Sequence, residues 1–171
     1  MKLVISTIGP DRVGLVEAIS KVINDCNCNI EDSKMAVFCG EFAAIFLVAG
    51  SEQALATLER RSDELRQHGL TVFIRKPSDR PRGEPTIPYR ITASSLDHPG
   101  IVYRITRTLA EAGINIEAME TKHYYAPTSG APMFRFEADI SVPTHVNLPR
   151  LRAHLQQIGE EENIDIELSS N

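Results

Sequence analysis

The chain has 171 residues, of which 18 are basic and 23 are acidic, and its formal net charge is −5. With 42% hydrophobic and 24% charged residues, its composition is that of an ordinary globular protein and excludes a disordered chain. The acidic balance, without any basic block, argues against direct binding of nucleic acid, because contacts to phosphate supply most of the non-specific affinity.

Cysteine content and hydropathy predict the compartment. The three cysteines, Cys26, Cys28 and Cys39, form an odd, clustered set that does not resemble a disulfide framework. The N-terminal segment turns polar at Ser6, too early for a secretory signal peptide, and no apolar run approaches the roughly 20 residues that span a bilayer. We therefore expect a cytoplasmic protein in a reducing environment, with no membrane partner.

The first half of the chain predicts a strand, a helix, two strands, a second helix and a final strand. Residues 2–8 are rich in Val, Ile and Thr, which favour strands. After a turn at residues 9–14, apolar side chains recur with the spacing of one helix face: Leu15, Ile19, Val22, Ile23 and Cys26. Two strands follow at about residues 30–38 and 41–49, and a second helix and a last strand complete the half.

The second half repeats this order. Gly100 lies 86 residues after Gly14, and the triplet Asn-Ile-Glu at residues 29–31 recurs in the same register at residues 115–117. The two strands that follow the helix are expected at about residues 115–125 and 133–142. The repeat predicts two modules of the order βαββαβ.

The stretch between the two halves predicts the domain boundaries. Residues 76–88 contain four prolines, one glycine and several charges, which is typical of a stiff, exposed linker. We expect a first module over 1–76, a linker over 77–87 and a second module over 88–171. The predicted fold class is α+β, with two ferredoxin-like modules, each a four-stranded antiparallel sheet with two helices on one face.

The opposite, helix-free faces of the two sheets differ in their pattern. Residues 133–142 alternate apolar and polar side chains, as a half-buried antiparallel strand does. Residues 41–49 are apolar on both sides, which predicts that the first sheet is also covered on its helix-free face, either by the other module or by a second chain. The alternative is that its small alanines tolerate exposure.

Several chemistries of this fold are disfavoured. An RNA-recognition module has a basic residue at the start of its third strand, where this chain has Glu41. A heavy-metal carrier of this fold has a Cys-x-x-Cys motif in its first loop, which this chain lacks. Cys26 and Cys28 are better explained as core residues at a helix end. The five histidines show no metal-ligand spacing, and no nucleophile elbow, Walker loop or dinucleotide-binding motif occurs. We therefore expect a protein that is not an enzyme, without catalytic residues, metal site or cofactor.

The repeated turn and the repeated strand start suit a small amino acid. A helix N-terminus offers N–H donors and positive potential to a carboxylate, and the amide oxygen of an Asn side chain offers an acceptor to an ammonium group beside it. The candidate ligand-binding residues are Asp11, Arg12, Val13, Gly14, Asn29, Ile30, Asp97, His98, Pro99, Gly100, Asn115 and Ile116.

Each candidate also has a purely structural explanation. Asp11 and Asp97 could cap the helices that follow them, which the sequence favours over contact with a ligand. The two asparagines could make the turn into their strands. Arg12 and His98 could be ordinary surface residues.

The two motifs together resemble the ACT family of regulatory modules. The resemblance rests on the turns Asp11-Arg12-Val13-Gly14 and Asp97-His98-Pro99-Gly100 and on the strand starts Asn29-Ile30 and Asn115-Ile116. It covers nearly the whole chain and implies a sensor that binds a small amino acid, glycine or a similar one, between modules. It also implies a homo-oligomer.

The first half resembles one stand-alone tandem member of this family more closely. That resemblance implies a repressor that holds a transcription activator protein inactive through protein contact, with no direct contact to nucleic acid. Two alternatives remain open, which are an interaction module that has lost its ligand and a regulatory subunit of an enzyme of amino-acid metabolism.

Overall fold

The computed structural model describes residues 1–78 and 84–170, which divide into two compact units, Met1–Arg80 and Pro81–Asn171. The elements of unit 1 are β1 (Lys2–Pro10), α1 (Leu15–Asp25), β2 (Asn29–Phe38), β3 (Glu41–Ala49), α2 (Glu52–Gln67) and β4 (Thr71–Arg75). The elements of unit 2 are β5 (Thr86–Leu96), α3 (Ile101–Glu111), β6 (Asn115–Tyr125), β7 (Pro132–Pro143), α4 (Leu148–Glu162) and β8 (Asp165–Ser170).

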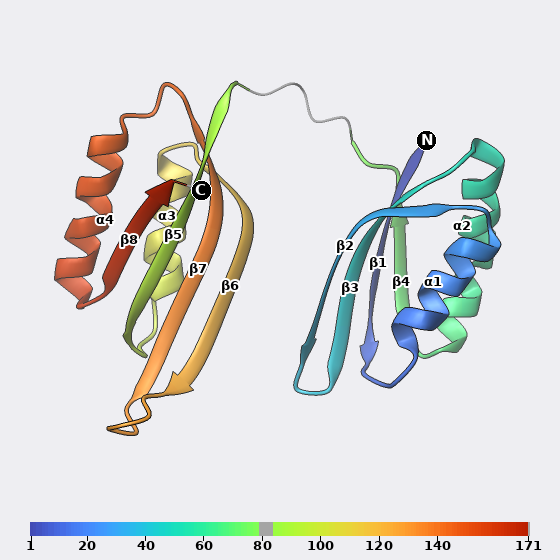
Figure 1. The fold of residues 1–171 in the computed structure, drawn as a ribbon, viewed down its shortest axis with the longest axis horizontal. Coiled ribbons are helices and arrows are strands. Elements are labelled where there is room, and N and C mark those ends of the chain that lie inside the picture. Colours follow the sequence, from blue (N-terminus) through green and yellow to red (C-terminus); the bar gives the residue numbers. More distant parts are fainter. Residues whose placement is uncertain (79–83, 171) are drawn as a thin grey trace. The chain divides into compact units, whose positions relative to one another are not determined.

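Both units have the predicted ferredoxin-like fold (Figure 1). The strand order is β2-β3-β1-β4 in unit 1 and β6-β7-β5-β8 in unit 2, and all neighbouring strands are antiparallel. The two helices of each unit cover the same face of its sheet, so each sheet keeps one helix-free face (Figure 1). The predicted α+β fold class is confirmed.

The helices form where the apolar spacing predicted them, and they cover one core in each unit. In α1 the buried residues are Leu15, Ile19, Val22 and Ile23, and in α3 they are Ile101, Ile105 and Leu109. Cys26 belongs to the core of unit 1, as predicted, and Cys28 packs against that core. Each fully buried large aliphatic side chain stabilises its unit by about 1.5–3 kcal/mol.

β1 and β5 extend beyond the bounds that the sequence predicts, because pairing with a long neighbour lengthens them, whereas β3 has the predicted bounds. β1 pairs with β3 from Lys2↔Ala49 to Pro10↔Glu41. β5 pairs with β7 from Thr86 onward, so the last two residues of the predicted linker, 86 and 87, belong to a strand. The part of the linker at residues 79–83 lies outside the described residues.

The edge strands β2 and β6 carry a β-bulge at the same place of the repeat. The pairing register shifts between Ile30 and Asp32 in β2, and between Ile116 and Ala118 in β6. The extra residue is the glutamate of the Asn-Ile-Glu triplet in both units. A bulge moves every later side chain to the other face of the sheet, so Asp32, which pairs with Leu47, lies on the helix-free face.

An ionic cluster joins the two helices of unit 1. Arg61 of α2 lies 2.6 Å from Glu64 and 3.7 Å from Asp25 of α1, which also pairs with Lys21 at 2.7 Å. The hydrogen bond from Lys21 lowers the pKa of Asp25, and the hydrogen bond from Arg61 lowers the pKa of Glu64. These groups are partly exposed to solvent, so their contribution to stability is small.

Candidate functional site

The turn between β1 and α1 presents uncapped helix amides. The N-cap residue is Gly14, at φ 93°, a left-handed conformation that favours glycine. No side chain of the described residues caps α1. The expectation that Asp11 caps the helix is wrong, because the residue lies three positions too early, where its backbone N–H donates to the Gly40 carbonyl at 2.7 Å.

The other two residues of this turn differ in their surroundings: Arg12 contacts α2, and Val13 is exposed to solvent. Arg12 donates from Nη2 to the carbonyl of His68, the C-cap residue of α2, at 2.6 Å. This bond satisfies a carbonyl at a helix end and ties the turn to α2. Val13 is fully exposed, which is unusual for an aliphatic side chain.

The equivalent turn of unit 2 has the same backbone and different side-chain contacts. Gly100 is the N-cap residue at φ 103°, again without a side-chain cap, so Asp97 does not cap α3 either. The Asp97 carboxylate lies 3.7 Å from Nε2 of His123 on β6. The Nδ1 atom of His98 lies 3.2 Å from the Pro99 carbonyl, and its buried Nε2 has no partner among the described residues.

The asparagines lie at the opposite end of each unit from the turns, which corrects the expectation that the two motifs are adjacent. Asn29 pairs with Ala49, which pairs with Lys2, whereas the turn follows Pro10 at the far end of β1. Eight residues of strand at about 3.4 Å each separate these ends by about 27 Å. The same registers separate Asn115 from the turn that follows Leu96. One small ligand cannot contact both motifs of one unit.

A groove beside Asn115 was not predicted from the sequence. It has a volume of about 520 Å³ between the outer side of α3 and the start of β6, and its lining is Tyr103, Thr106, Arg107, Ala110, Ile114, Asn115 and Ile116. The Asn115 side-chain amide donates to Glu117 at 2.6 Å, and the hydrogen bond to Glu111 raises the pKa of Arg107. The groove therefore joins an apolar lining to an amide and a guanidinium.

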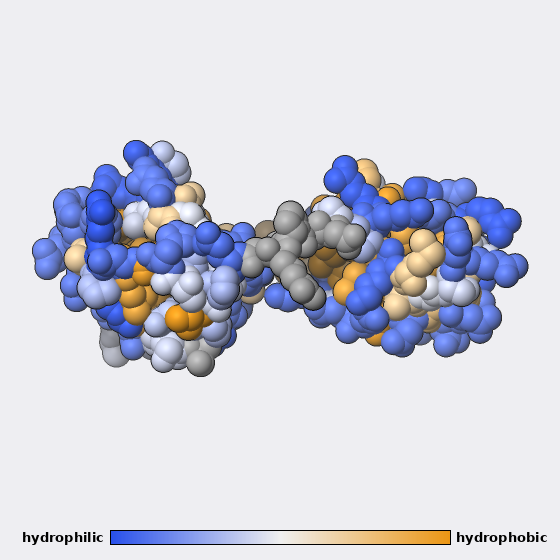
Figure 2. Space-filling view, turned by 90° about the horizontal axis from the view of Figure 1, so that it is seen from above, coloured by the Kyte–Doolittle hydropathy of each residue, from blue (hydrophilic) through white to orange (hydrophobic). Residues whose placement is uncertain are grey.

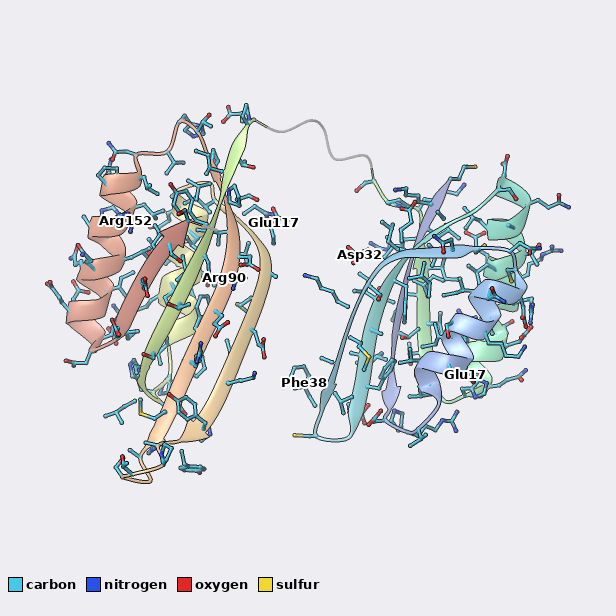
Figure 3. The ribbon with its side chains drawn as sticks, in the orientation of Figure 1. Glu17, Asp32, Phe38, Arg90, Glu117 and Arg152 are labelled. Carbon is cyan, nitrogen blue, oxygen red and sulfur yellow. The ribbon has the colours of Figure 1, made fainter. Side chains whose placement is uncertain are left out.

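The helix-free face of unit 1 is apolar. Its side chains are Val4, Ile8, Ala36, Phe38, Ala43, Ile45, Leu47 and Phe73, which we call the apolar face of unit 1. Ile8, Ile45 and Phe73 are 48%, 47% and 62% exposed, and a shallow basin of about 420 Å³ lies among them. Phe38 projects from the sheet on the side opposite α1 and α2 (Figure 3). No residue among 1–78 covers this face, so its predicted cover remains a prediction.

The helix-free face of unit 2 is charged, and we call it the charged face of unit 2. Its side chains include Arg90, Glu120, Lys122, Arg135, Glu137, Asp139 and Glu167. An ion pair joins neighbouring strands there, with Arg90 of β5 2.8 Å from Asp139 of β7. A second ion pair lies within β7, with Arg135 2.6 Å from Glu137. The predicted alternation of β7 is confirmed, because its apolar residues are buried in the core. Figure 2 shows that apolar residues interrupt the mostly hydrophilic surface of both units.

Metal sites and membrane-spanning helices are absent from the described residues. Among the residues that the structure describes, no group of three or more His, Cys, Asp or Glu side chains is placed to hold a metal ion. No helix in the described part of the chain is long and apolar enough to cross a membrane.

The two βαββαβ units, each with a glycine turn before its first helix and an asparagine at the start of its second strand, define a tandem ferredoxin-like architecture, and comparison with known proteins identifies the family. A model of the ACT domain matches residues 1–75, and a UPF0237 protein of Methanocaldococcus jannaschii is 34% identical over 76 residues, which cover 43% of this chain and 84% of that protein. The chain belongs to the ACT-domain family.

Several proteins match the chain over most of its length. The glycine cleavage system transcriptional repressor of Escherichia coli (strain K12) is 26% identical over 165 residues, covering 94% of this chain and 85% of the repressor. The crystal structure of an unknown protein from Galdieria sulphuraria superposes with a TM-score of 0.83 at 29% identity, covering 99% of this chain and 98% of that one. Both relatives therefore span the two units.

Proposed function

We propose that this chain is a non-enzymatic, amino-acid-responsive regulator that represses transcription of the glycine cleavage system by contacting an activator protein rather than DNA. The observation that carries the proposal is the match to the Escherichia coli repressor along 94% of the chain, through both units. The net charge of −5 supports an indirect action, because an acidic chain is repelled by phosphate.

The ligand is a small amino acid, glycine or a similar one, held between two modules. The turn and the asparagine of one unit lie about 27 Å apart, by the strand rise of about 3.4 Å per residue. A composite site therefore takes its turn from one module and its strand start from another. This arrangement links ligand binding to the way the modules associate, which is what a sensor requires.

Each part of the composite site has a separate role. The uncapped amides after Gly14 or Gly100 bind the α-carboxylate, aided by the positive end of the helix. The side chain of Asn29 or Asn115 accepts from the α-ammonium group, and Asp11 or Asp97 adds a negative charge near it. Ile30 and Ile116, both half-buried, form the apolar wall, and Val13 or Pro99 closes the turn side.

Arg12 and His98 distinguish the two copies of the site. Arg12 already donates to His68, so a carboxylate at this turn would share a guanidinium that also holds the end of α2. Nε2 of His98 has no partner among the described residues, but it is buried, so a contact with the ligand requires the imidazole ring to turn outward.

Isothermal titration of the apo protein with glycine, serine and alanine tests the ligand. We expect heat from at least one of them and its loss in Asn29→Ala or Asn115→Ala, with Asn24→Ala, an exposed residue of α1, as the matched control. No heat with any amino acid would refute the sensor role.

The partner needs a second experiment. We expect the chain to retain the activator of the glycine cleavage genes on an affinity resin, with retention that changes on adding glycine, and to leave a promoter fragment unshifted when it is alone. Retention that ignores every amino acid would favour a ligand-free interaction module, for which the apolar face of unit 1 is the supporting observation.

A further inference from the structure

The apolar face of unit 1 is large enough for a stable interface. Its central strands, β1 and β3, have nine residues each, and four strands lie side by side. At about 3.4 Å per residue and about 4.8 Å per strand, the face is at most about 30 Å by about 19 Å, because β4 has only five residues. Its flat area is below about 570 Å², and the relief of the exposed side chains brings its accessible surface closer to the roughly 800 Å² that each partner of a standard interface contributes.

The charged face of unit 2 is a poor cover for it. Equivalent positions of the two sheets place Glu137 where unit 1 has Ile45, and Glu167 where unit 1 has Phe73. Stacking the one face on the other would remove these carboxylates and their arginine partners from water against aliphatic carbon. Desolvation of the charges opposes that arrangement.

The rim of the apolar face carries opposite charges on its two edges. Asp32 on β2 and Arg75 on β4 lie in the same row across the sheet, through Leu47 and Val4. Neither forms an ion pair with another described residue. In the next row, Lys34 on β2 and Phe73 on β4 flank Ile45 and Ser6. The face is thus apolar at its centre, with groups of complementary chemistry on opposite edges.

We propose that the apolar face of unit 1 is a self-association surface on which the same face of a second copy stacks. The two-fold axis lies between β1 and β3, parallel to the strands, so that β2 of one copy covers β4 of the other. Asp32 then meets Arg75 of the second copy, and Lys34 meets the ring of Phe73 of the second copy. Large side chains meet small ones in the central rows, with Ile8 opposite Ala43 and Ile45 opposite Ser6, which suits stacked sheets about 10 Å apart.

Sedimentation velocity of the full chain without any amino acid tests this surface independently of the proposed ligand. We expect the wild type to sediment at twice the monomer mass at about 10 µM, and Ile45→Glu to weaken the dimer by at least about 100-fold, because central apolar contacts dominate interfaces. The matched control Ser94→Glu adds the same charge to the charged face of unit 2 beside Arg135, and it should remain dimeric. Circular dichroism checks that each variant is folded.

A charge exchange tests the orientation of the dimer. Asp32→Arg should weaken the dimer by about 10-fold, because it places two arginines together at each edge, and the double variant Asp32→Arg/Arg75→Asp should restore it. A monomeric wild type at 100 µM, a dimer unaffected by Ile45→Glu, or a double variant no tighter than the single one would each overturn the proposal. A wild-type monomer whose Ile45→Glu variant loses the activator would assign the face to a foreign protein instead, and would overturn it as well.

Discussion

The two helix-free faces occupy the same place in the same fold and have opposite chemistry. Unit 1 presents Ile45 and Phe73 where unit 2 presents Glu137 and Glu167, while the central strands of both sheets bury mostly apolar side chains under the helices. The helix-covered face must be apolar for either unit to fold, because its burial stabilises the unit. The helix-free face is under no such requirement, so the residues there report what each unit contacts.

The largest expected effect is on the free energy of unfolding, and it tests whether the two units unfold independently. Ile5 and Ile91 are equivalent residues on β1 and β5, and both are fully buried. We expect Ile5→Ala and Ile91→Ala each to destabilise only their own unit, by about 3 kcal/mol, through lost burial and a residual cavity. Urea unfolding monitored by hydrogen exchange in each unit measures this, and an equal loss in both units from one substitution would contradict it.

The next effect compares the two turns. Gly14 and Gly100 have φ values of 93° and 103°, and a Cβ built on either meets no atom within 4 Å. Alanine at either position therefore strains only the backbone, and we expect a loss of about 1–2 kcal/mol that is similar in the two units. Chemical denaturation of Gly14→Ala and Gly100→Ala measures it. Loss of amino-acid binding without loss of stability would show that the turn amides act on the ligand alone.

A smaller effect on stability is expected when the apolar residues of the helix-free face of unit 1 are introduced at the equivalent positions of unit 2. Ser94→Ile with Glu137→Ile and Glu167→Phe gives unit 2 the apolar positions of unit 1. Because these side chains are on the outer face, we expect the stability of unit 2 to change by less than about 0.5 kcal/mol. We also expect new association, visible as species larger than a dimer in sedimentation. An unchanged sedimentation profile would mean that apolarity alone does not make a self-association surface.

The smallest expected effect is the change in the stability of unit 1 as the pH is lowered. The pKa values of Asp25 and Glu64 are lowered by their partners in the folded state, so they stabilise unit 1 above their ordinary pKa values and lose that contribution as the pH falls through the folded values. Between about pH 5 and pH 3 we therefore expect unit 1 to lose stability. The Asp25→Asn/Glu64→Gln variant should lose less in this range. A wild type and variant with parallel melting-temperature profiles against pH would contradict this.

The fold was predictable because the apolar spacing is local and repeated, and the helix-covered strands and helices lie where that spacing indicates. The position of Asn29 relative to the turn could not be predicted in the same way. Nearness in sequence does not reveal that α1, with 11 residues at about 1.5 Å each, carries the chain back to the other end of the sheet. Contacts such as Arg12 with His68 join residues 56 positions apart, and no local pattern signals them. The cap assigned to Asp11 failed because a glycine in the left-handed conformation takes the N-cap position itself.

The bulge at Glu31 and at Glu117 has a consequence for the history of the gene. Ordinary strands arise in any sequence with the right alternation, but an extra residue at the same step of the same edge strand is an irregularity that two unrelated sequences have no reason to share. The two halves therefore descend from one ancestral module that already had the bulge before its gene was duplicated. The two helix-free faces now differ, so at least one of them changed after that duplication, and this difference between the halves is younger than their fold.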